Sequence, residues 1–139
     1  MSTATEILAR GGAPGRAGVW AGRILSGLVI AFLVMDAGMK LARLPVVEQT
    51  GQSLGLPAGL GFPLGVLLAA ITVLYAIPRT AVLGAILLTG YLGGAVCTHV
   101  IAGSPLASHV LFGVYIGVMA WAGRWLRIPA VRALLPLRR

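Results

Sequence analysis

The sequence predicts an all-α integral membrane protein, a four-helix bundle with both termini in the cytoplasm. Its 139 residues are 58% hydrophobic and only 10% charged, whereas soluble domains carry about 25% charged residues. Four apolar windows lie at residues 24–41, 59–77, 80–101 and 109–125. Each is close to the roughly 20 residues with which a helix crosses a bilayer. The windows lack the polar face of soluble amphipathic helices and the alternation of spanning β-strands.

Proline positions support the limits of the four windows. Proline lacks an amide donor and fixes φ, so it is tolerated in connections and at helix starts rather than inside helices. The prolines that lie between or beyond the windows are Pro45, Pro57, Pro78, Pro105, Pro129 and Pro136. Pro63 is the exception, and we interpret it as a first-turn proline of a helix that begins near Gly61 or Phe62.

The two ends of the chain are predicted to flank the membrane domain. Residues 1–20 are rich in polar residues, glycine and alanine and lack the apolar core of a cleavable signal, so we expect a disordered cytoplasmic tail. The first window is then an uncleaved signal anchor. The membrane domain covers residues 21–128, and residues 129–139 form a basic cytoplasmic tail.

The distribution of basic residues indicates the orientation of the chain. With four spans, the basic residues on one side are Arg10, Arg16, Arg23, Arg79, Arg124, Arg127, Arg132, Arg138 and Arg139. Only Lys40 and Arg43 fall on the other side, so the positive-inside bias predicts that both termini are cytoplasmic. Trp20, Trp121 and Trp125 lie at the same interface, as aromatic anchors do. The net charge of +8 therefore indicates orientation and contact with anionic headgroups rather than nucleic-acid binding.

Asp36 is the most unusual residue, because an aspartate at bilayer depth costs roughly 2.5 to 3.5 kcal/mol on insertion scales. Such a residue normally faces a bundle interior, a partner or a wet cavity. With the termini inside, the first and third windows run outward and their polar side chains converge on the outer end of the bundle. The predicted polar pocket consists of Asp36, Lys40, Glu48, Tyr91, Thr98, His99 and His109.

Structural interpretations of these residues remain open beside the functional one. Asp36 and Lys40 can form an intrahelical pair in which the lysine neutralises the acid and extends to the interface. His109 can cap the helix that it opens, together with Ser108. Pairs with small-x-x-x-small spacing, which allow close helix contacts within a bundle or between copies of the chain, occur at Gly61/Gly65, Gly90/Gly94 and Gly113/Gly117.

Motifs for metal binding or autonomous catalysis are incomplete. The acids and histidines of the pocket lack the short paired spacing of structural zinc sites, so no metal site is predicted. His99 and His109 are separated by a tight turn, which makes opposed haem ligation difficult. Cys97, the single cysteine, excludes an internal disulfide and is expected to be a small packing residue. The sequence contains no phosphate-binding glycine loop, nucleophile elbow or paired catalytic carboxylates, so an autonomous enzyme is not indicated.

Several motifs resemble those of a known family in their order and spacing. They are F-L-V-M-D-A-G-M-K-L at 32–41 followed by P-V-V at 45–47, G-G-A-V-C-T-H at 93–99, A-G-S-P-L-A-S-H at 102–109 and R-A-L-L-P-L-R at 132–138. Together they resemble the DoxX-like membrane proteins over most of residues 22–138. The resemblance implies a small four-helix membrane protein that acts as a subunit. Members are linked to quinone-dependent sulfur oxidation, terminal oxidase complexes and oxidative-stress membrane assemblies, and no agreed catalytic residue carries over.

Two classes of function are expected. The resemblance favours an accessory subunit of a quinone-linked or oxidative-stress membrane redox complex, in which the pocket contacts a quinone head group or relays a proton through Asp36 and a histidine. The residues themselves favour a non-catalytic membrane scaffold or assembly factor. A third alternative, an oligomeric small-solute transporter, lacks support from a repeat or a broken helix. The expected partners are the plasma or inner membrane bilayer, other redox subunits and further copies of the chain.

Overall fold

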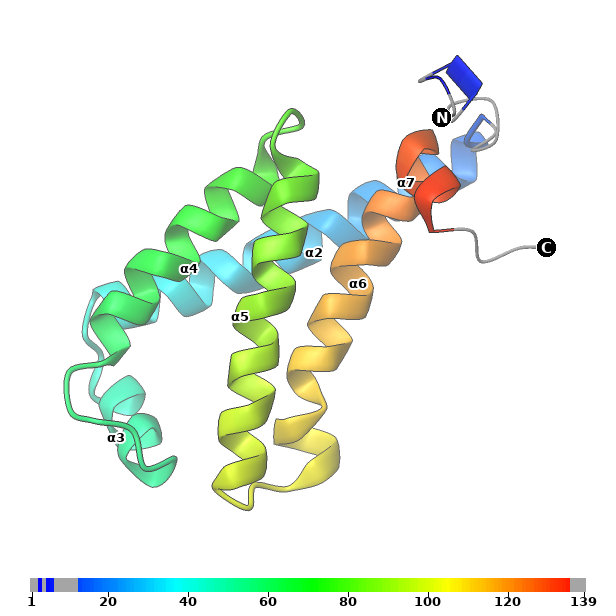
Figure 1. Cartoon of the computed structure of the whole chain (residues 1–139). Helices are drawn as coiled ribbons and strands as arrows, with labels where there is room; N and C mark the ends of the chain where they lie inside the picture. Colours follow the sequence, from blue (N-terminus) through cyan, green and yellow to red (C-terminus); the bar gives the residue numbers. More distant parts are fainter. Residues whose placement is uncertain (1–2, 4, 7–12, 136–139) are drawn as a thin grey trace. The chain divides into compact units, whose positions relative to one another are not determined.

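The computed structural model describes residues 3, 5–6 and 13–135. These residues form helices and turns with no strand among them, so the predicted all-α class is confirmed. The elements are α2 (Arg16–Leu41), α3 (Pro45–Ser53), α4 (Gly61–Ala76), α5 (Ala81–Ile101), η1 (Leu106–Val110), α6 (Phe112–Arg127) and α7 (Pro129–Leu134) (Figure 1). The element η1 is a single π-helical turn, and Leu111 separates it from α6.

Among the described residues, three helical segments are long and apolar enough to cross a membrane. They are α2, α5 and the segment Leu106–Arg127 that η1 and α6 form together. The fourth apolar helix, α4, has 16 residues. At a rise of 1.5 Å per residue it is about 24 Å long, somewhat shorter than a hydrocarbon core of about 30 Å. Each predicted window therefore contains an apolar helix, and three of these reach the length of a span.

Two boundaries differ from the sequence prediction. Helix α2 begins at Arg16, so residues 16–20 are helical and do not belong to a disordered tail. Arg23 interrupts the apolar run without interrupting the helix, because arginine is a good helix former. Helix α7 occupies the start of the predicted C-terminal tail. The parts of the two predicted tails that lie outside the described residues are 1–2, 4, 7–12 and 136–139, with Arg10, Arg138 and Arg139.

The chain divides into two compact units. The terminal unit comprises Met1–Leu28 and Val118–Arg139, and the central unit comprises Val29–Gly117. Helices α2 and α6 each contribute residues to both units. The central unit contains all residues of the predicted polar pocket.

Helices α4 and α5 form an antiparallel hairpin in the central unit (Figure 1). Gly84 of α5 lies directly against α4, because a Cβ built at this position would be 2.3 Å from the amide nitrogen of Tyr75. Tyr75 is itself fully buried. The missing side chain at position 84 thus allows the close backbone approach that small residues provide between membrane helices.

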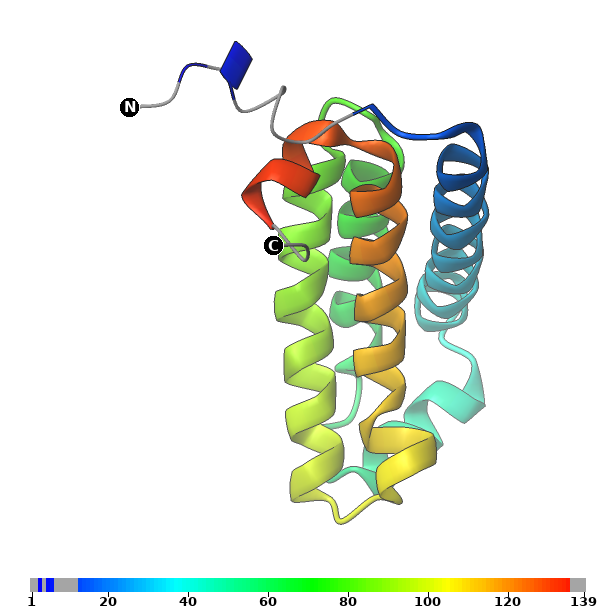
Figure 2. The same ribbon diagram turned by 90° about the vertical axis from the view of Figure 1, so that its right-hand side faces the viewer.

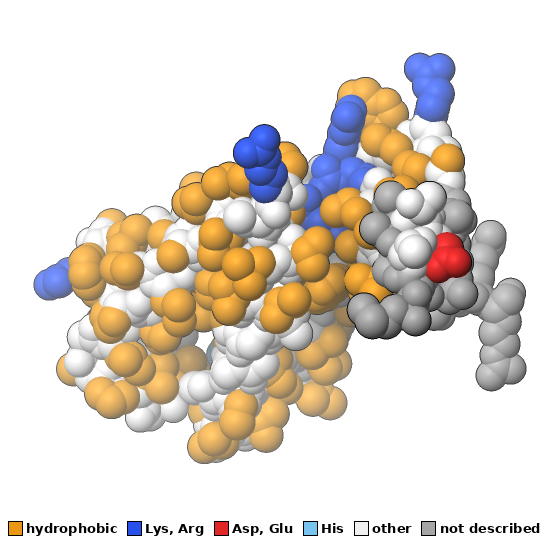
Figure 3. Space-filling view, turned by 45° about the horizontal axis from the view of Figure 1, so that its top comes forward, with side chains coloured by type: hydrophobic (Ala, Val, Ile, Leu, Met, Phe, Trp, Pro, Cys, Tyr) orange, Lys and Arg blue, Asp and Glu red, His pale blue; other side chains and the backbone are white. Residues whose placement is uncertain are grey.

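The core of the central unit includes one buried stripe on each of α2, α4 and α5. Its members recur at intervals of three or four residues, the helical period, and they include Val29, Leu33, Ala37, Leu68, Ile71, Tyr75, Ala81, Ala85, Leu88 and Leu92. Exposed side chains of the same helices are also large and apolar, for example Val34, Met35, Val66, Val73, Leu83 and Ile86. In Figure 3 hydrophobic side chains extend over most of the visible face and Lys and Arg form separate groups. Apolar outer faces of this extent suit lipid rather than water.

A second glycine contact joins α2 and α6 in the terminal unit. A Cβ at Gly22 would lie 2.8 Å from the carbonyl oxygen of Gly123, and a Cβ at Gly123 would lie 2.6 Å from Ser26 Oγ. Arg127 spans this contact, since its Nη2 donates to Ser26 Oγ at 2.9 Å and its Nε donates to the Gly123 carbonyl oxygen at 3.1 Å. Arg127 therefore provides hydrogen-bond donors for the polar groups of Ser26 and Gly123 at this contact.

Helix α7 supplies hydrogen-bond donors for carbonyl groups at the end of α6. Arg132 donates to the carbonyl oxygens of Trp125 and Leu126 at 3.2 and 2.9 Å, and its guanidinium lies 5.1 Å from the centroid of the Trp125 ring. The Trp125 indole donates in turn to the carbonyl oxygen of Leu135 at 3.0 Å. The last carbonyl groups of α6, which have no partner within the helix, are satisfied by this arginine.

The contact at Gly84 predicts a large difference between two glycine substitutions in α5. Gly84→Ala forces a methyl group against the α4 backbone and is expected to lower the free energy of unfolding by about 1–3 kcal/mol or more, as overpacked cores do. Gly93→Ala is the matched control, because no atom lies within 4 Å of a Cβ there and alanine is the better helix former by about 1 kcal/mol. Thermal unfolding in mild detergent measures both. Equal melting temperatures would contradict the contact.

Candidate functional site

The central unit contains a cavity of about 660 Å³. Residues from α2, α3, α4, α5, η1 and the start of α6 line it, together with the segment between α3 and α4. Both ribbon views place α3 and the turn between α5 and η1 at the same end of the unit, away from the turn between α4 and α5 (Figures 1 and 2). Most lining side chains are apolar. The volume falls within the roughly 300–1,000 Å³ of small-molecule pockets.

All residues of the predicted polar pocket line this one cavity. They are Asp36 and Lys40 of α2, Glu48 of α3, Tyr91, Thr98 and His99 of α5, and His109 of η1. The structure therefore brings together side chains from four separate elements. Their chemical role stays a prediction.

Asp36 and Lys40 form an ion pair on the last turns of α2. Lys40 Nζ donates to Asp36 Oδ1, and the two side chains are 18% exposed for Lys40 and 22% for Asp36. Their i, i+4 spacing means that α2 alone builds the pair. The α2 backbone is held close to α4 at this point, because a Cβ at Gly65 would lie 2.7 Å from Lys40 Cβ. The lysine stem thus belongs to a helix contact while the paired charges line the cavity.

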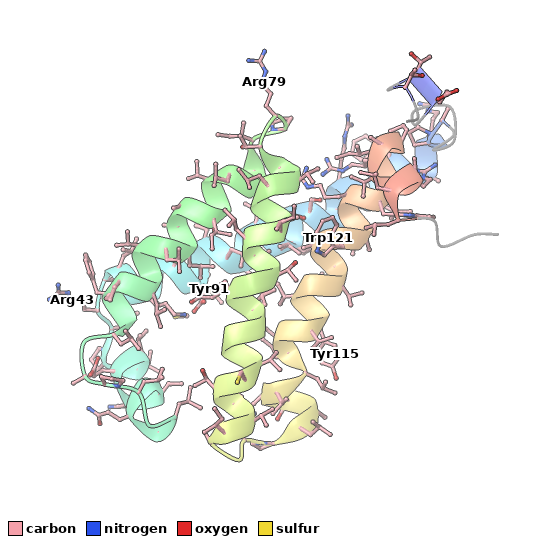
Figure 4. The ribbon with its side chains drawn as sticks, viewed as in Figure 1. Arg43, Arg79, Tyr91, Tyr115 and Trp121 are labelled. Atoms are coloured by element: carbon pink, nitrogen blue, oxygen red, sulfur yellow. The ribbon has the colours of Figure 1, made fainter. Side chains whose placement is uncertain are left out.

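The end of α2 is fixed by a Schellman turn. The amide of Leu44 donates to the Met39 carbonyl oxygen and that of Arg43 to the Lys40 carbonyl oxygen, both at 3.2 Å. Arg43 has a φ of 53°, in the left-handed region where glycine is usual. Its guanidinium lies 4.6 Å from the centroid of the Phe62 ring, and Figure 4 shows the side chain pointing away from the helices. The charge of Arg43 is therefore directed outside the cavity.

Glu48 holds the connection between α3 and α4. Its two carboxylate oxygens accept hydrogen bonds from the Gly59 amide at 3.1 and 3.3 Å. Gly59 has a φ of 79°, which a residue with a side chain rarely adopts. Gly55, two residues after the end of α3 at Ser53, has a φ of 75°, and the Leu56 amide donates to the Gly51 carbonyl oxygen at 2.9 Å. The carboxylate therefore has a structural task in the cavity wall.

The two histidines lie next to each other across the turn between α5 and η1. Their ring centroids are 5.8 Å apart and the ring planes are tilted by 58°. His99 Nδ1 bonds to Ser104 Oγ at 3.0 Å, and His109 Nδ1 bonds to Ser108 Oγ at 2.7 Å. Gly103, with a φ of 66°, reverses the chain and lets the Ser104 amide donate to the His99 carbonyl oxygen at 3.0 Å. The capping interpretation of His109 and Ser108 is wrong, because no side chain caps η1.

Three residues of α5 differ in their surroundings. Thr98 Oγ1 donates to the Gly94 carbonyl oxygen at 2.9 Å and is thereby satisfied within its own helix. Tyr91 points from α5 toward the side on which α4 lies (Figure 4), and it lines the cavity. Cys97 is exposed, so the expectation of a buried packing residue is wrong. Its helical position places it among the outward apolar residues rather than in the stripe that forms the core.

The glycine pairs divide into contacts and open positions. A Cβ at Gly61 would lie 2.8 Å from Val47 Cγ1, and a Cβ at Gly113 would lie 3.0 Å from Val96 Cγ2, so these glycines are packed against neighbouring elements. Gly90 and Gly94 have no atom within 4 Å of a Cβ, and they line the cavity. The α5 pair therefore leaves space instead of forming a helix contact.

Sequence reasoning missed the contribution of α3 to the cavity. Val46, Thr50 and Leu54 line it at intervals of one helical turn. This spacing and the proline that opens the helix are signals that could have revealed an amphipathic helix. The edge-to-face contact of Phe32 and Phe112, with ring centroids 5.1 Å apart, is a further part of the wall that the sequence does not indicate.

The arrangement is suited to binding a mostly apolar ligand that has polar acceptor groups. The ammonium of Lys40, the hydroxyl of Tyr91 and the imidazoles are donors in the wall of a mostly apolar space. Within residues 3, 5–6 and 13–135, no group of three or more His, Cys, Asp or Glu side chains could hold a metal ion.

The Asp36–Lys40 pair predicts a strong coupling between two substitutions. Asp36→Asn or Lys40→Met alone leaves one largely buried charge without its partner and is expected to destabilise the protein, whereas the double variant removes both charges and recovers most of the loss. The expected coupling is about 1–3 kcal/mol. Denaturant unfolding in mild detergent of the four proteins in the cycle measures it. If the changes in the free energy of unfolding of the two single variants add up in the double variant, the coupling energy is zero and the pair contributes nothing to stability.

Comparisons with known proteins place the chain in a family. The model of the DoxX-like family matches residues 24–123, a range that includes every residue of the predicted polar pocket. Searches of curated proteins and of solved structures found no match. The family match agrees with the three apolar helices of spanning length in describing a membrane protein. Because this match covers well over half of its length, the chain belongs to the DoxX-like family.

Proposed function

We propose that the protein is a quinone-binding accessory subunit of a membrane redox complex. The observation that supports this function is the cavity of about 660 Å³, whose mostly apolar lining includes polar side chains from α2, α3, α5 and η1. A quinone combines an apolar ring and tail with two carbonyl oxygens that accept hydrogen bonds. The cavity offers the complementary groups, with room for a ring between them.

The polar side chains of the cavity suit carbonyl acceptors. Lys40 and Tyr91 offer donors from α2 and α5, and the histidines offer ring nitrogens that donate or accept hydrogen bonds. Asp36 pairs with Lys40 in these surroundings. A quinone head group held here would place its tail among apolar helix faces that suit lipid.

The same proposal includes the arrangement of the chain in the membrane. All four apolar helices span the plasma or inner membrane as a bundle, with α4 as a short fourth span, and both termini are cytoplasmic. The charge distribution supports this orientation: residues 1–28 and 118–139 contain eight arginines and a single acid, Glu6. The positive-inside bias places such segments in the cytoplasm.

A scaffold or assembly role is the second candidate, and one observation favours it. Asp36 and Glu48 have partners within the chain, an ammonium and a backbone amide, so both acids already have structural tasks. In that role the cavity has no ligand-binding task, and the protein contributes helix surfaces to a larger assembly.

Two neighbouring glycines provide a test of quinone binding. Gly94 lines the cavity and Gly93 does not, although neither has an atom within 4 Å of a Cβ. Gly94→Leu is expected to fill part of the cavity and lower the amount of co-purified quinone several-fold, whereas Gly93→Leu retains the wild-type amount. The measurement is chromatography of the quinones extracted from protein that was purified in mild detergent from its native membrane.

The outcomes of this experiment separate the two candidate functions. Mass spectrometry of the same preparation identifies co-purifying proteins, and an oxidoreductase partner with bound quinone supports the redox subunit. Protein partners without quinone, or equal quinone in the two leucine variants, would reject the proposed binding site and leave the scaffold role.

Cysteine labelling tests the orientation. In a Cys97→Ala background, Gln52→Cys places a thiol on α3 and Pro78→Cys places one in the turn between α4 and α5, both at exposed positions. A membrane-impermeant maleimide applied to intact cells is expected to label the first variant, and to label the second only after permeabilisation. The reverse pattern would overturn the orientation, and labelling of both in intact cells would exclude a fourth span between them.

A further inference from the structure

We infer that His99 and His109 together bind one divalent transition-metal ion of the zinc or copper class. They are the only histidines of the chain, and the turn between α5 and η1 brings them to one rim of the cavity. Imidazole nitrogen is a favoured ligand for both metals. The inference does not depend on quinone binding, because it rests on these two rings, their serine partners and the charges that line the cavity.

The separation of the rings fits a shared ion. Imidazole nitrogen binds zinc at about 2.0–2.1 Å, so two rings that bind one ion through Nε2 have centroids about 5–6 Å apart at metal-centred angles of about 105–130°. The observed separation of the two centroids is 5.8 Å. The observed distance between the rings therefore matches the distance that a shared ion requires.

Both rings already have the outer hydrogen bonds that metal-binding histidines require. Such histidines usually donate from the nitrogen that does not bind the metal, which fixes the tautomer and the ring orientation. Here Ser104 Oγ and Ser108 Oγ occupy the two Nδ1 atoms at 3.0 and 2.7 Å. Each Nε2 thus remains for a ligand, since no hydrogen bond involves these atoms in the described part of the chain.

The charges that line the cavity also favour a cation. Lys40 is neutralised by Asp36 in the same helical turn. Glu48 has only the Gly59 amide as a hydrogen-bond partner among the described residues, so its negative charge is not paired with a basic side chain. Arg43 does not line the cavity and points outward (Figure 4). The cavity therefore has a net negative charge when the histidines are neutral, the form in which they bind metals.

Two protein ligands leave coordination positions open. No third His, Cys, Asp or Glu of the described residues belongs to the group, so water completes the coordination of the ion. Affinity is expected to follow the general order in which Cu²⁺ binds more tightly than Zn²⁺ at nitrogen sites.

The test uses the purified full-length protein with an affinity tag that contains no histidine. Titration with Cu²⁺ is followed by electron paramagnetic resonance and calorimetry. We expect one tight ion per chain, with hyperfine coupling to two imidazole nitrogens and displacement by excess Zn²⁺. His99→Gln and His109→Gln are each expected to weaken binding about tenfold or more. Ser108→Ala is expected to weaken it about tenfold, as the loss of an outer hydrogen bond does.

Ser53→Ala is the matched control, because this serine lies on α3 and bonds only to the Thr50 carbonyl oxygen. Its Cu²⁺ affinity should equal that of the wild type. Two independent ions with one nitrogen each, or binding no tighter than in a variant without both histidines, would overturn the inference. The stoichiometry and nitrogen count of the wild-type protein decide this even where a variant fails to fold.

Discussion

The need to satisfy backbone carbonyl groups at helix ends is the constraint on which the central unit depends. The last carbonyl groups of a helix have no partner within the helix, so other groups must satisfy them. Helices α2, α3 and α5 meet this constraint in the same way, with left-handed residues at Arg43, Gly55 and Gly103 and amide donors that reach back to the last turn. These turns also fix the positions of the cavity side chains, because the ion pair, Glu48 and both histidines lie within a few residues of them.

Glycine has two opposite effects in this fold. At Gly65 and Gly84 the missing side chain lets helices touch, and a Cβ would collide with the neighbouring helix. At Gly90 and Gly94 the missing side chain leaves space, and the cavity extends along this part of α5. The cavity therefore exists beside tightly packed contacts, because Gly65 and Gly84 face a neighbouring helix whereas Gly90 and Gly94 face open space.

The fold class and the clustering of polar residues could be predicted from the sequence, because both follow from hydropathy and from the direction in which each apolar window runs. Asp36 and Lys40 pair as their i, i+4 spacing indicates. Helix α3 was not predicted, because it has too few apolar residues for a hydropathy signal. The hydrogen bond between Glu48 and the Gly59 amide was not predicted either, because it depends on a loop conformation. The direct contact of the two histidine rings was not predicted, because it depends on the turn at Gly103.

The local nature of the Asp36–Lys40 pair has a consequence for biosynthesis. Both residues belong to the first apolar helix, so their ion pair needs no other part of the fold and is available as soon as that helix has formed. Residues 24–41 of the helix, in which Asp36 and Lys40 are the only charged side chains, can then enter the bilayer without net charge before α4 and α5 have been synthesised. A partner on a later helix would instead leave the aspartate exposed to lipid while the ribosome completes the chain.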